Sequence, residues 1–67
     1  VKMLYNQKGK LSEVRYNYDT YTDYEVLTYN LEGKLSNVAH YVESILRGNT
    51  SLNYENGKLI AAPYTTV

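Results

Sequence analysis

The feature that most constrains the fold is a ten-residue stretch that this chain contains twice. "YNQKGKLSEV" occupies residues 5–14, and "YNLEGKLSNV" occupies residues 29–38, with seven of the ten positions identical at a spacing of 24 residues. A shorter third copy, "YENGKLI", occupies residues 54–60. A fixed period of this size is typical of repeat architectures, in which each unit stacks on the next.

Each copy is centred on a glycine, and Gly9, Gly33 and Gly57 lie 24 residues apart. Glycine adopts the positive φ that closes a β-hairpin, and the Asn56-Gly57 pair is a strong hairpin signal. Tyr54 lies one residue closer to its glycine than the tyrosines of the first two copies do, so the third turn is one residue shorter. The repeats therefore predict three hairpins, with Gly9, Gly33 and Gly57 as the repeat turns.

The segments that flank these turns alternate in character and are rich in Tyr, Val, Leu and Thr, as half-buried strands are. Six strands are expected, near residues 1–6, 10–18, 24–30, 34–46, 51–55 and 58–64. Return connections are expected at 19–23 and 47–50, where turn-forming residues gather. The predicted fold is all-β: an antiparallel β-meander of about six strands built from 24-residue hairpin repeats. Residues 1–67 would form one small β-repeat domain or a fragment of a larger repeat array.

One segment also fits a helix. From Val38 to Leu46, apolar residues recur at the i, i+3, i+4, i+7 and i+8 positions of an amphipathic helix, and Ser36 and Gly48 could cap its ends. The equivalent segment of the first repeat has little helical character, so the repeat favours a strand. A short helix near 37–47 remains as the alternative.

Composition excludes several classes of function. The seven basic and seven acidic residues give zero net charge, which argues against nucleic-acid binding. No cysteine and one histidine leave no basis for a disulfide, a structural zinc site or another cofactor. No apolar run is long enough for membrane insertion, and no signal peptide is present. Because the chain begins with Val1, we expect it to be processed or cut from a longer protein.

No group of residues has the pattern of a catalytic site. His40 and Glu43 would share a face only on a helix, so metal binding there is not expected. The aspartates at 19 and 23 flank a turn rather than a cleft, and Ser12 and Ser36 repeat without a basic partner. The chain is therefore predicted not to be an enzyme.

Lysines and tyrosines are the residues most able to form a surface. Lys10, Lys34 and Lys58 would align in register if the units stack, and such a row discourages aggregation between sheet edges more readily than it binds an anion. Nine tyrosines without Phe or Trp suit half-exposed sheet faces. A sharper interpretation is an aromatic platform for a glycan or a protein. The candidate binding surface comprises Tyr16, Tyr18, Tyr24, Tyr29 and Tyr41.

The Tyr-Asn-x-x-Gly-Lys-Leu-Ser-x-Val pattern resembles the YD repeat of the Rhs family, which writes Tyr-Asp-x-x-Gly-Arg-Leu, then a small polar residue and often Val. Asn6 and Asn30 stand where the family has Asp, and Lys10 and Lys34 stand where it has Arg. The matching positions are Tyr5, Gly9, Leu11 and Val14 in the first copy, Tyr29, Gly33, Leu35 and Val38 in the second, and Tyr54, Gly57 and Leu59 in the third. The MORN repeat is a weaker rival, because its Gly-Trp segment has no counterpart here.

The YD resemblance implies a bacterial surface or secreted protein whose repeats form extended, non-catalytic sheets. The function expected is a structural scaffold segment at the cell surface or outside the cell. The alternative is a small β-module that binds glycan or protein through exposed tyrosines. Because a single sheet of this size buries little, we expect self-association or contact with the remainder of a larger parent protein.

Overall fold

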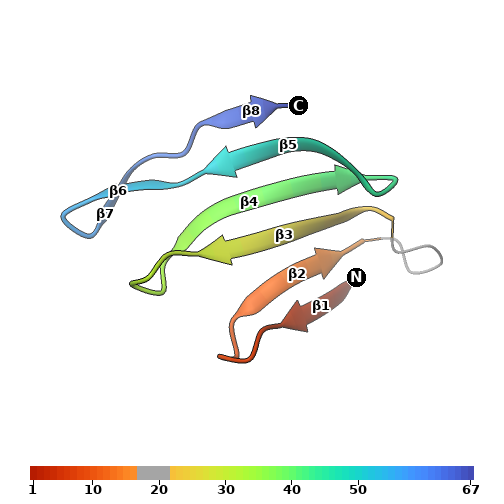
Figure 1. Cartoon of the computed structure of the whole chain (residues 1–67), viewed down its shortest axis with the longest axis horizontal. Helices are drawn as coiled ribbons and strands as arrows, with labels where there is room; N and C mark the ends of the chain where they lie inside the picture. The colour runs from red at the N-terminus through yellow and green to blue at the C-terminus, as the bar shows by residue number, and fades with distance from the viewer. Residues whose placement is uncertain (17–21) are drawn as a thin grey trace.

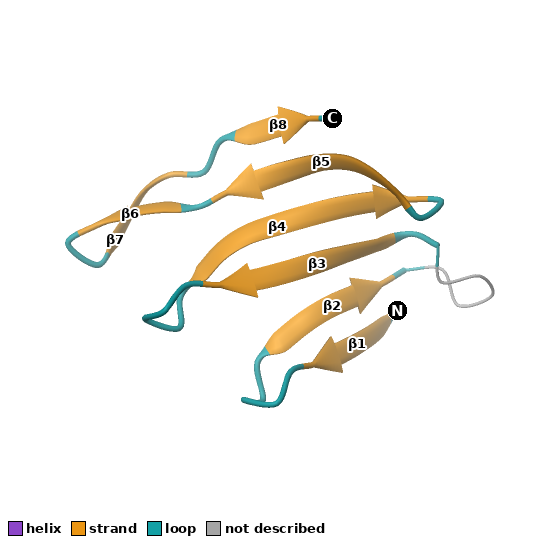
Figure 2. Ribbon diagram, in the orientation of Figure 1, coloured by secondary structure: helices purple, strands orange, loops and turns teal. Residues whose placement is uncertain are grey.

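Three hairpin turns line one side of a single antiparallel sheet in the computed structural model, which describes residues 1–16 and 22–67 (Figure 1). The strands are β1 (Lys2–Tyr5), β2 (Leu11–Arg15), β3 (Tyr24–Tyr29), β4 (Leu35–Val42), β5 (Ile45–Ser51), β6 (Asn53–Glu55), β7 (Lys58–Ala61) and β8 (Tyr64–Thr66). Their order is β1-β2-β3-β4-β5-β8, and β6 pairs with β7 at the end of the third hairpin (Figure 2). The prediction of an all-β antiparallel meander is confirmed.

The first two turns share one local design. Gly9 and Gly33 have φ angles of 80° and 82°, and the amide of each donates to the carbonyl oxygen of the asparagine three residues earlier. The side-chain oxygen of Asn6 accepts hydrogen bonds from the amides of Lys8 and Lys10, at 2.9 and 3.0 Å. Asn30 does the same in the second repeat. A left-handed glycine that ends a three-residue loop is a common way to close a hairpin, so these residues explain why the motif recurs.

A β-bulge follows each turn. In the first repeat Tyr5 pairs with Leu11 and Leu4 pairs with Glu13, so Ser12 is the additional residue. The same shift occurs between Thr28 and Tyr29 in the second repeat and between Asn53 and Tyr54 in the third. The tyrosine and leucine of each motif are therefore paired across their hairpin in all three repeats.

The shorter third turn is matched by a bulge elsewhere. On β5, Leu46 pairs with Tyr41 and Gly48 pairs with His40, which makes Arg47 an additional residue. This residue moves Tyr54 one position along the chain, and the two-residue turn at Asn56 and Gly57 then restores the period. Both turn residues have positive φ, 52° and 79°, as a type I′ hairpin requires.

The predicted strand over 34–46 and the predicted return loop over 47–50 are wrong. A tight turn at Glu43 and Ser44, with φ angles of 54° and 62°, divides that segment, and residues 47–50 lie within β5. The amides of Glu43 and Ser44 donate to Asp23 and Thr22 beside them. The helix alternative over 37–47 is also wrong, because β4 and the start of β5 occupy these residues. The other predicted return, at 19–23, falls mostly outside the described residues.

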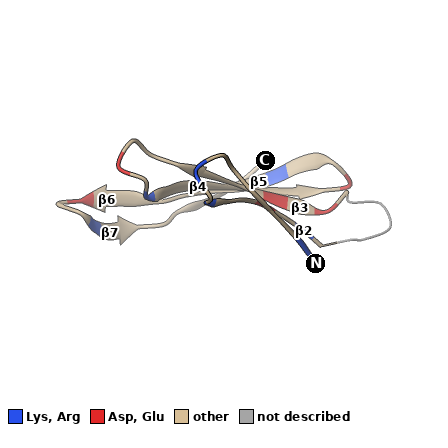
Figure 3. Ribbon diagram, turned by 90° about the horizontal axis from the view of Figure 1, so that it is seen from below, with Lys and Arg blue, Asp and Glu red and all other residues tan. Residues whose placement is uncertain are grey.

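The sheet is one layer without a covering layer (Figure 3). It extends 42 × 29 × 14 Å, and no described side chain is fully buried. Its accessible surface is 4810 Å², whereas a compact protein of this mass would expose about 4300 Å². Gly48 is the one described residue classed as buried, because Tyr64 covers it: a Cβ at Gly48 would lie 2.4 Å from Cζ of Tyr64. Contacts within the layer must therefore provide most of its stability.

Candidate functional site at the joints between repeats

The first and second hairpins are joined by reciprocal contacts between motif residues. Lys10 Nζ donates a 2.8 Å hydrogen bond to the carbonyl oxygen of Gly33, and it lies 5.2 Å from the centre of the Tyr29 ring. In return, the hydroxyl of Tyr29 donates a 2.6 Å hydrogen bond to the carbonyl oxygen of Leu11. We call this four-residue arrangement the first joint. Its lysine and leucine come from one repeat, and its tyrosine and glycine come from the next.

The same arrangement recurs between the second and third hairpins. Lys34 Nζ donates to the carbonyl oxygen of Gly57 at 2.8 Å and lies 5.4 Å from the centre of the Tyr54 ring. The hydroxyl of Tyr54 donates to the carbonyl oxygen of Leu35 at 2.7 Å. Because this second joint reproduces the first so closely, the joint belongs to the repeat rather than to one place in the chain.

The serine of the motif acts within its own hairpin. Ser12 Oγ donates to the carbonyl oxygen of Leu4, and Ser36 Oγ donates to that of Thr28, both at 3.1 Å. Each serine is the bulge residue of its hairpin, so its hydroxyl occupies a backbone acceptor where the ladder is disrupted. These bonds explain the repeated serines structurally.

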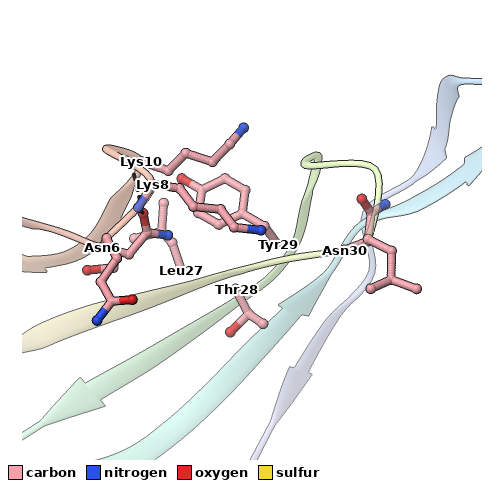
Figure 4. A pocket seen from close by; sticks show the side chains of 10 residues that line it. Asn6, Lys8, Lys10, Leu27, Thr28, Tyr29 and Asn30 are labelled. Carbon is pink, nitrogen blue, oxygen red and sulfur yellow. Dashed lines mark hydrogen bonds between the residues drawn. The ribbon is translucent and has the colours of Figure 1, made fainter.

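A shallow hollow lies beside the first joint. It has a volume of about 600 Å³ and is lined by the first turn, the end of β3 and the start of the second turn. Figure 4 shows the Lys10 and Lys8 side chains beside the Tyr29 ring, with Asn6 and Leu27 below them. The hollow is open to solvent, and its lysine and tyrosine are already engaged with each other and with backbone carbonyls.

The predicted tyrosine surface is distributed over several places. Tyr24 and Tyr41 are directly opposite each other on β3 and β4, and their rings stack with centroids 4.7 Å apart and an interplanar angle of 16°. The Arg15 guanidinium lies 5.1 Å from the centre of the Tyr24 ring. Tyr29 belongs to the first joint, and Tyr18 lies outside the described residues. An Arg15–Tyr24–Tyr41 row is what the structure brings together.

Tyr16 lies on the opposite face from this row, with Glu25. Its hydroxyl donates to Oε1 of Glu25, whose other oxygen lies 3.8 Å from Nδ1 of His40. The hydrogen bond to the Glu25 carboxylate raises the pKa of Tyr16, and slight burial and the negative charge of Glu25 raise it further. A raised pKa keeps this phenol protonated, so it is a hydrogen-bond donor rather than a base.

Metal and membrane sites were also sought. Within residues 1–16 and 22–67, no three His, Cys, Asp or Glu side chains converge on a point where a metal could bind. The same residues include no helix of the length and apolar character that crossing a bilayer requires.

Sequence reasoning missed the joint. It identified Gly33 as a turn and Tyr29 as a surface residue, and it assigned the lysines to the prevention of aggregation. The available signal was that tyrosine, glycine, lysine and leucine recur together, which is the set that the joint uses. Tyr54, omitted from the predicted surface, is the partner of Lys34.

These contacts define an antiparallel β-hairpin repeat protein, held together in one layer by its repeated motif. No protein-family model, curated protein or solved structure matches the chain.

Proposed function

We propose that this chain is a non-catalytic structural module, a segment of a repetitive β-sheet scaffold. The observation that carries this proposal is the recurrence of the joint, with Lys10 and Lys34 each 2.8 Å from a glycine carbonyl oxygen in the following turn. Contacts of this kind link neighbouring units of a repeat array, whose stability then grows with the number of units.

The roles of the motif residues support the same proposal. The asparagine and glycine form the turn, the serine bonds at the bulge, and the lysine and tyrosine hold the adjacent repeat. The side chains of the motif are thus used within the sheet, which is the distribution expected of a scaffold.

The resemblance to the YD repeat of the Rhs family extends the proposal to its setting. We infer a bacterial surface or secreted protein, in which sheets of this kind form extended walls. The substitutions of Asn for Asp and Lys for Arg are compatible with the contacts described above, because Asn6 acts as an acceptor and Lys10 as a donor. An arginine at this position could also donate to a glycine carbonyl, and an aspartate could accept the same turn amides.

Lengthening the array tests the scaffold function. A duplicate of residues 11–34 inserted after Lys34 adds one repeat and one joint, because residues 11 and 35 are equivalent. We expect the free energy of unfolding, measured by urea denaturation, to rise by a similar amount with each inserted copy. The control is the same insertion with the joint lysine and tyrosine replaced by Met and Phe. Stability that stays level as repeats are added would rule out the scaffold function.

A second candidate function is supported by the Arg15–Tyr24–Tyr41 row. Two stacked rings beside a guanidinium, on a sheet face without a covering layer, form a surface that could hold a glycan ring or a protein side chain. Titration with oligosaccharides, followed by amide chemical shifts, tests it. A binding module would remain folded and lose its ligand when Tyr24 and Tyr41 are replaced by Leu, whereas no shift at β3 and β4 with any sugar would exclude glycan binding.

A further inference from the structure

The two ends of the sheet carry complementary halves of a joint. At the C-terminal end, Lys58 and Leu59 occupy the positions that Lys10 and Leu11 hold in the first repeat. Lys58 is exposed and its ammonium group has no partner among the described residues, while Leu59 is 53% exposed. This end thus offers the donor and the backbone carbonyl of a joint without the tyrosine and glycine.

The N-terminal end offers the missing half. Tyr5 is 61% exposed, and its hydroxyl faces only the sulfur of Met3, at 3.9 Å. Gly9 has no neighbouring atom within 4 Å of the position of a Cβ, whereas the same position lies 3.3 Å from Lys10 Nζ at Gly33 and 3.1 Å from Lys34 Nζ at Gly57. The place that a lysine occupies at the other two turns is therefore open at Gly9.

We propose that this edge is an interaction surface for a second copy of the chain, which docks head to tail. Lys58 of one copy donates to the carbonyl oxygen of Gly9 of the second and lies over its Tyr5 ring. The Tyr5 hydroxyl donates in return to the carbonyl oxygen of Leu59. This inference rests on the scaffold function proposed above, and it identifies the partner as another unit of the same repeat.

The backbone register supports this docking. Glu13 pairs with Val26, and Val14 pairs with Glu25, across the β2–β3 boundary at the first joint. Residues 13 and 14 advance by two periods of 24 to Ala61 and Ala62, and residues 26 and 25 move back by one period to Lys2 and Val1. The same shifts convert the first joint into the proposed one. The β7 and β1 edges can therefore form a ladder while the side chains form the joint.

Charge and symmetry also fit this occupant. The chain has zero net charge, so two copies do not repel each other as whole molecules. Because the two surfaces of the contact differ, each docked copy leaves a free end, and association continues as an open series rather than stopping at a symmetric dimer. The ladder is short, since Pro63 follows Ala62 and has no amide hydrogen, so the contact is expected to form in the high-micromolar to millimolar range.

Sedimentation equilibrium of the full chain from 10 μM to 1 mM tests this inference. We expect association that reverses on dilution and weakens at least tenfold in Lys58→Glu and in Tyr5→Ala. Lys8→Glu, with the same charge change in an exposed turn, and Leu31→Ala, at a fully exposed position, are the matched controls and should associate as the unchanged chain does. Circular dichroism establishes that each variant is folded.

Mixing the two variants tests the direction of docking. Lys58→Glu retains its N-terminal surface and Tyr5→Ala retains its C-terminal surface, so each should be monomeric alone and an equal mixture should form heterodimers and nothing larger. A strict monomer at 1 mM, or association that both variants retain, overturns the inference. Association lost only when Tyr24 and Tyr41 are replaced also overturns it, because the sheet faces would then be in contact. If inserted repeats still add stability, the scaffold function stands even where head-to-tail docking fails.

Discussion

Lys10 and Gly33 are 23 residues apart in the chain, yet the ammonium nitrogen of the first lies 2.8 Å from the carbonyl oxygen of the second. The bond crosses from one hairpin turn to the next, where no backbone ladder is present. It is accompanied by the Tyr29 ring on the same ammonium. The lysine thereby fixes the spacing between turns that the strands alone would leave free to vary.

Removing this lysine is expected to weaken the sheet. Lys10→Met keeps the aliphatic stem and removes the charged donor, which should lower the free energy of unfolding by about 1 kcal/mol. Lys34→Met should cost less, because the Lys34 bond is more exposed than the Lys10 bond. Urea denaturation provides the measurement. Lys8→Met is the control, and equal losses at Lys8 and Lys10 would contradict a specific role for the joint.

The tyrosine hydroxyls of the joints should also contribute measurably. Tyr29→Phe and Tyr54→Phe each leave a ring in place and remove a hydrogen bond to a leucine carbonyl oxygen. We expect each to lower the free energy of unfolding by about 1 kcal/mol. Tyr24→Phe is the matched control, because it preserves the ring stack with Tyr41 and should change stability by no more than a few tenths of a kcal/mol. A loss at Tyr24 as large as that at Tyr29 would show that the joint hydroxyls are not special.

The glycine turns and alternating strands could be predicted because each is encoded locally. Gly9 and Gly33 follow an asparagine at a fixed spacing, and alternating apolar residues suffice to predict a strand. The joint could not be predicted in the same way, since Lys10 meets Gly33 only after two hairpins have formed and aligned. Repetition showed that these residues mattered but not what they contacted.

The turn at Glu43 and Ser44 was missed for a different reason. Neither residue type favours positive φ, and the turn lies inside a segment whose apolar spacing resembles a helix. Local sequence therefore argued against the turn that forms. The flanking strands select it by their pairing with β3 and β8, and Thr22 and Asp23 hold its amides.

This unfavourable turn can be improved. Glu43→Asn combined with Ser44→Gly supplies the pair that a type I′ turn prefers and keeps both backbone amides that bond to Asp23 and Thr22. The change should raise the free energy of unfolding by about 1 kcal/mol, because left-handed conformations cost non-glycine residues a similar amount. Thermal unfolding provides the measurement, with Glu43→Gln as the control that leaves the backbone preference unchanged. A lower melting temperature for the double variant would mean that the two φ angles are not positive in solution.

Tyr16 should make stability depend on alkaline pH. Its hydrogen bond to the Glu25 carboxylate raises its pKa above the ordinary value of 10.0, so the folded chain holds this proton more tightly than the unfolded chain does. The stabilisation is therefore complete below pH 10 and is lost as the pH rises through the raised pKa of the folded state. Glu25→Gln should return the Tyr16 pKa toward 10.0, because the carboxylate and its charge are both removed. NMR titration of ring-labelled tyrosine measures this shift directly, with Tyr5 as an exposed internal reference. If Tyr16 titrates together with Tyr5 in the unchanged chain, the bond to Glu25 is not formed, and the polar contact on this face of β3 would need another explanation.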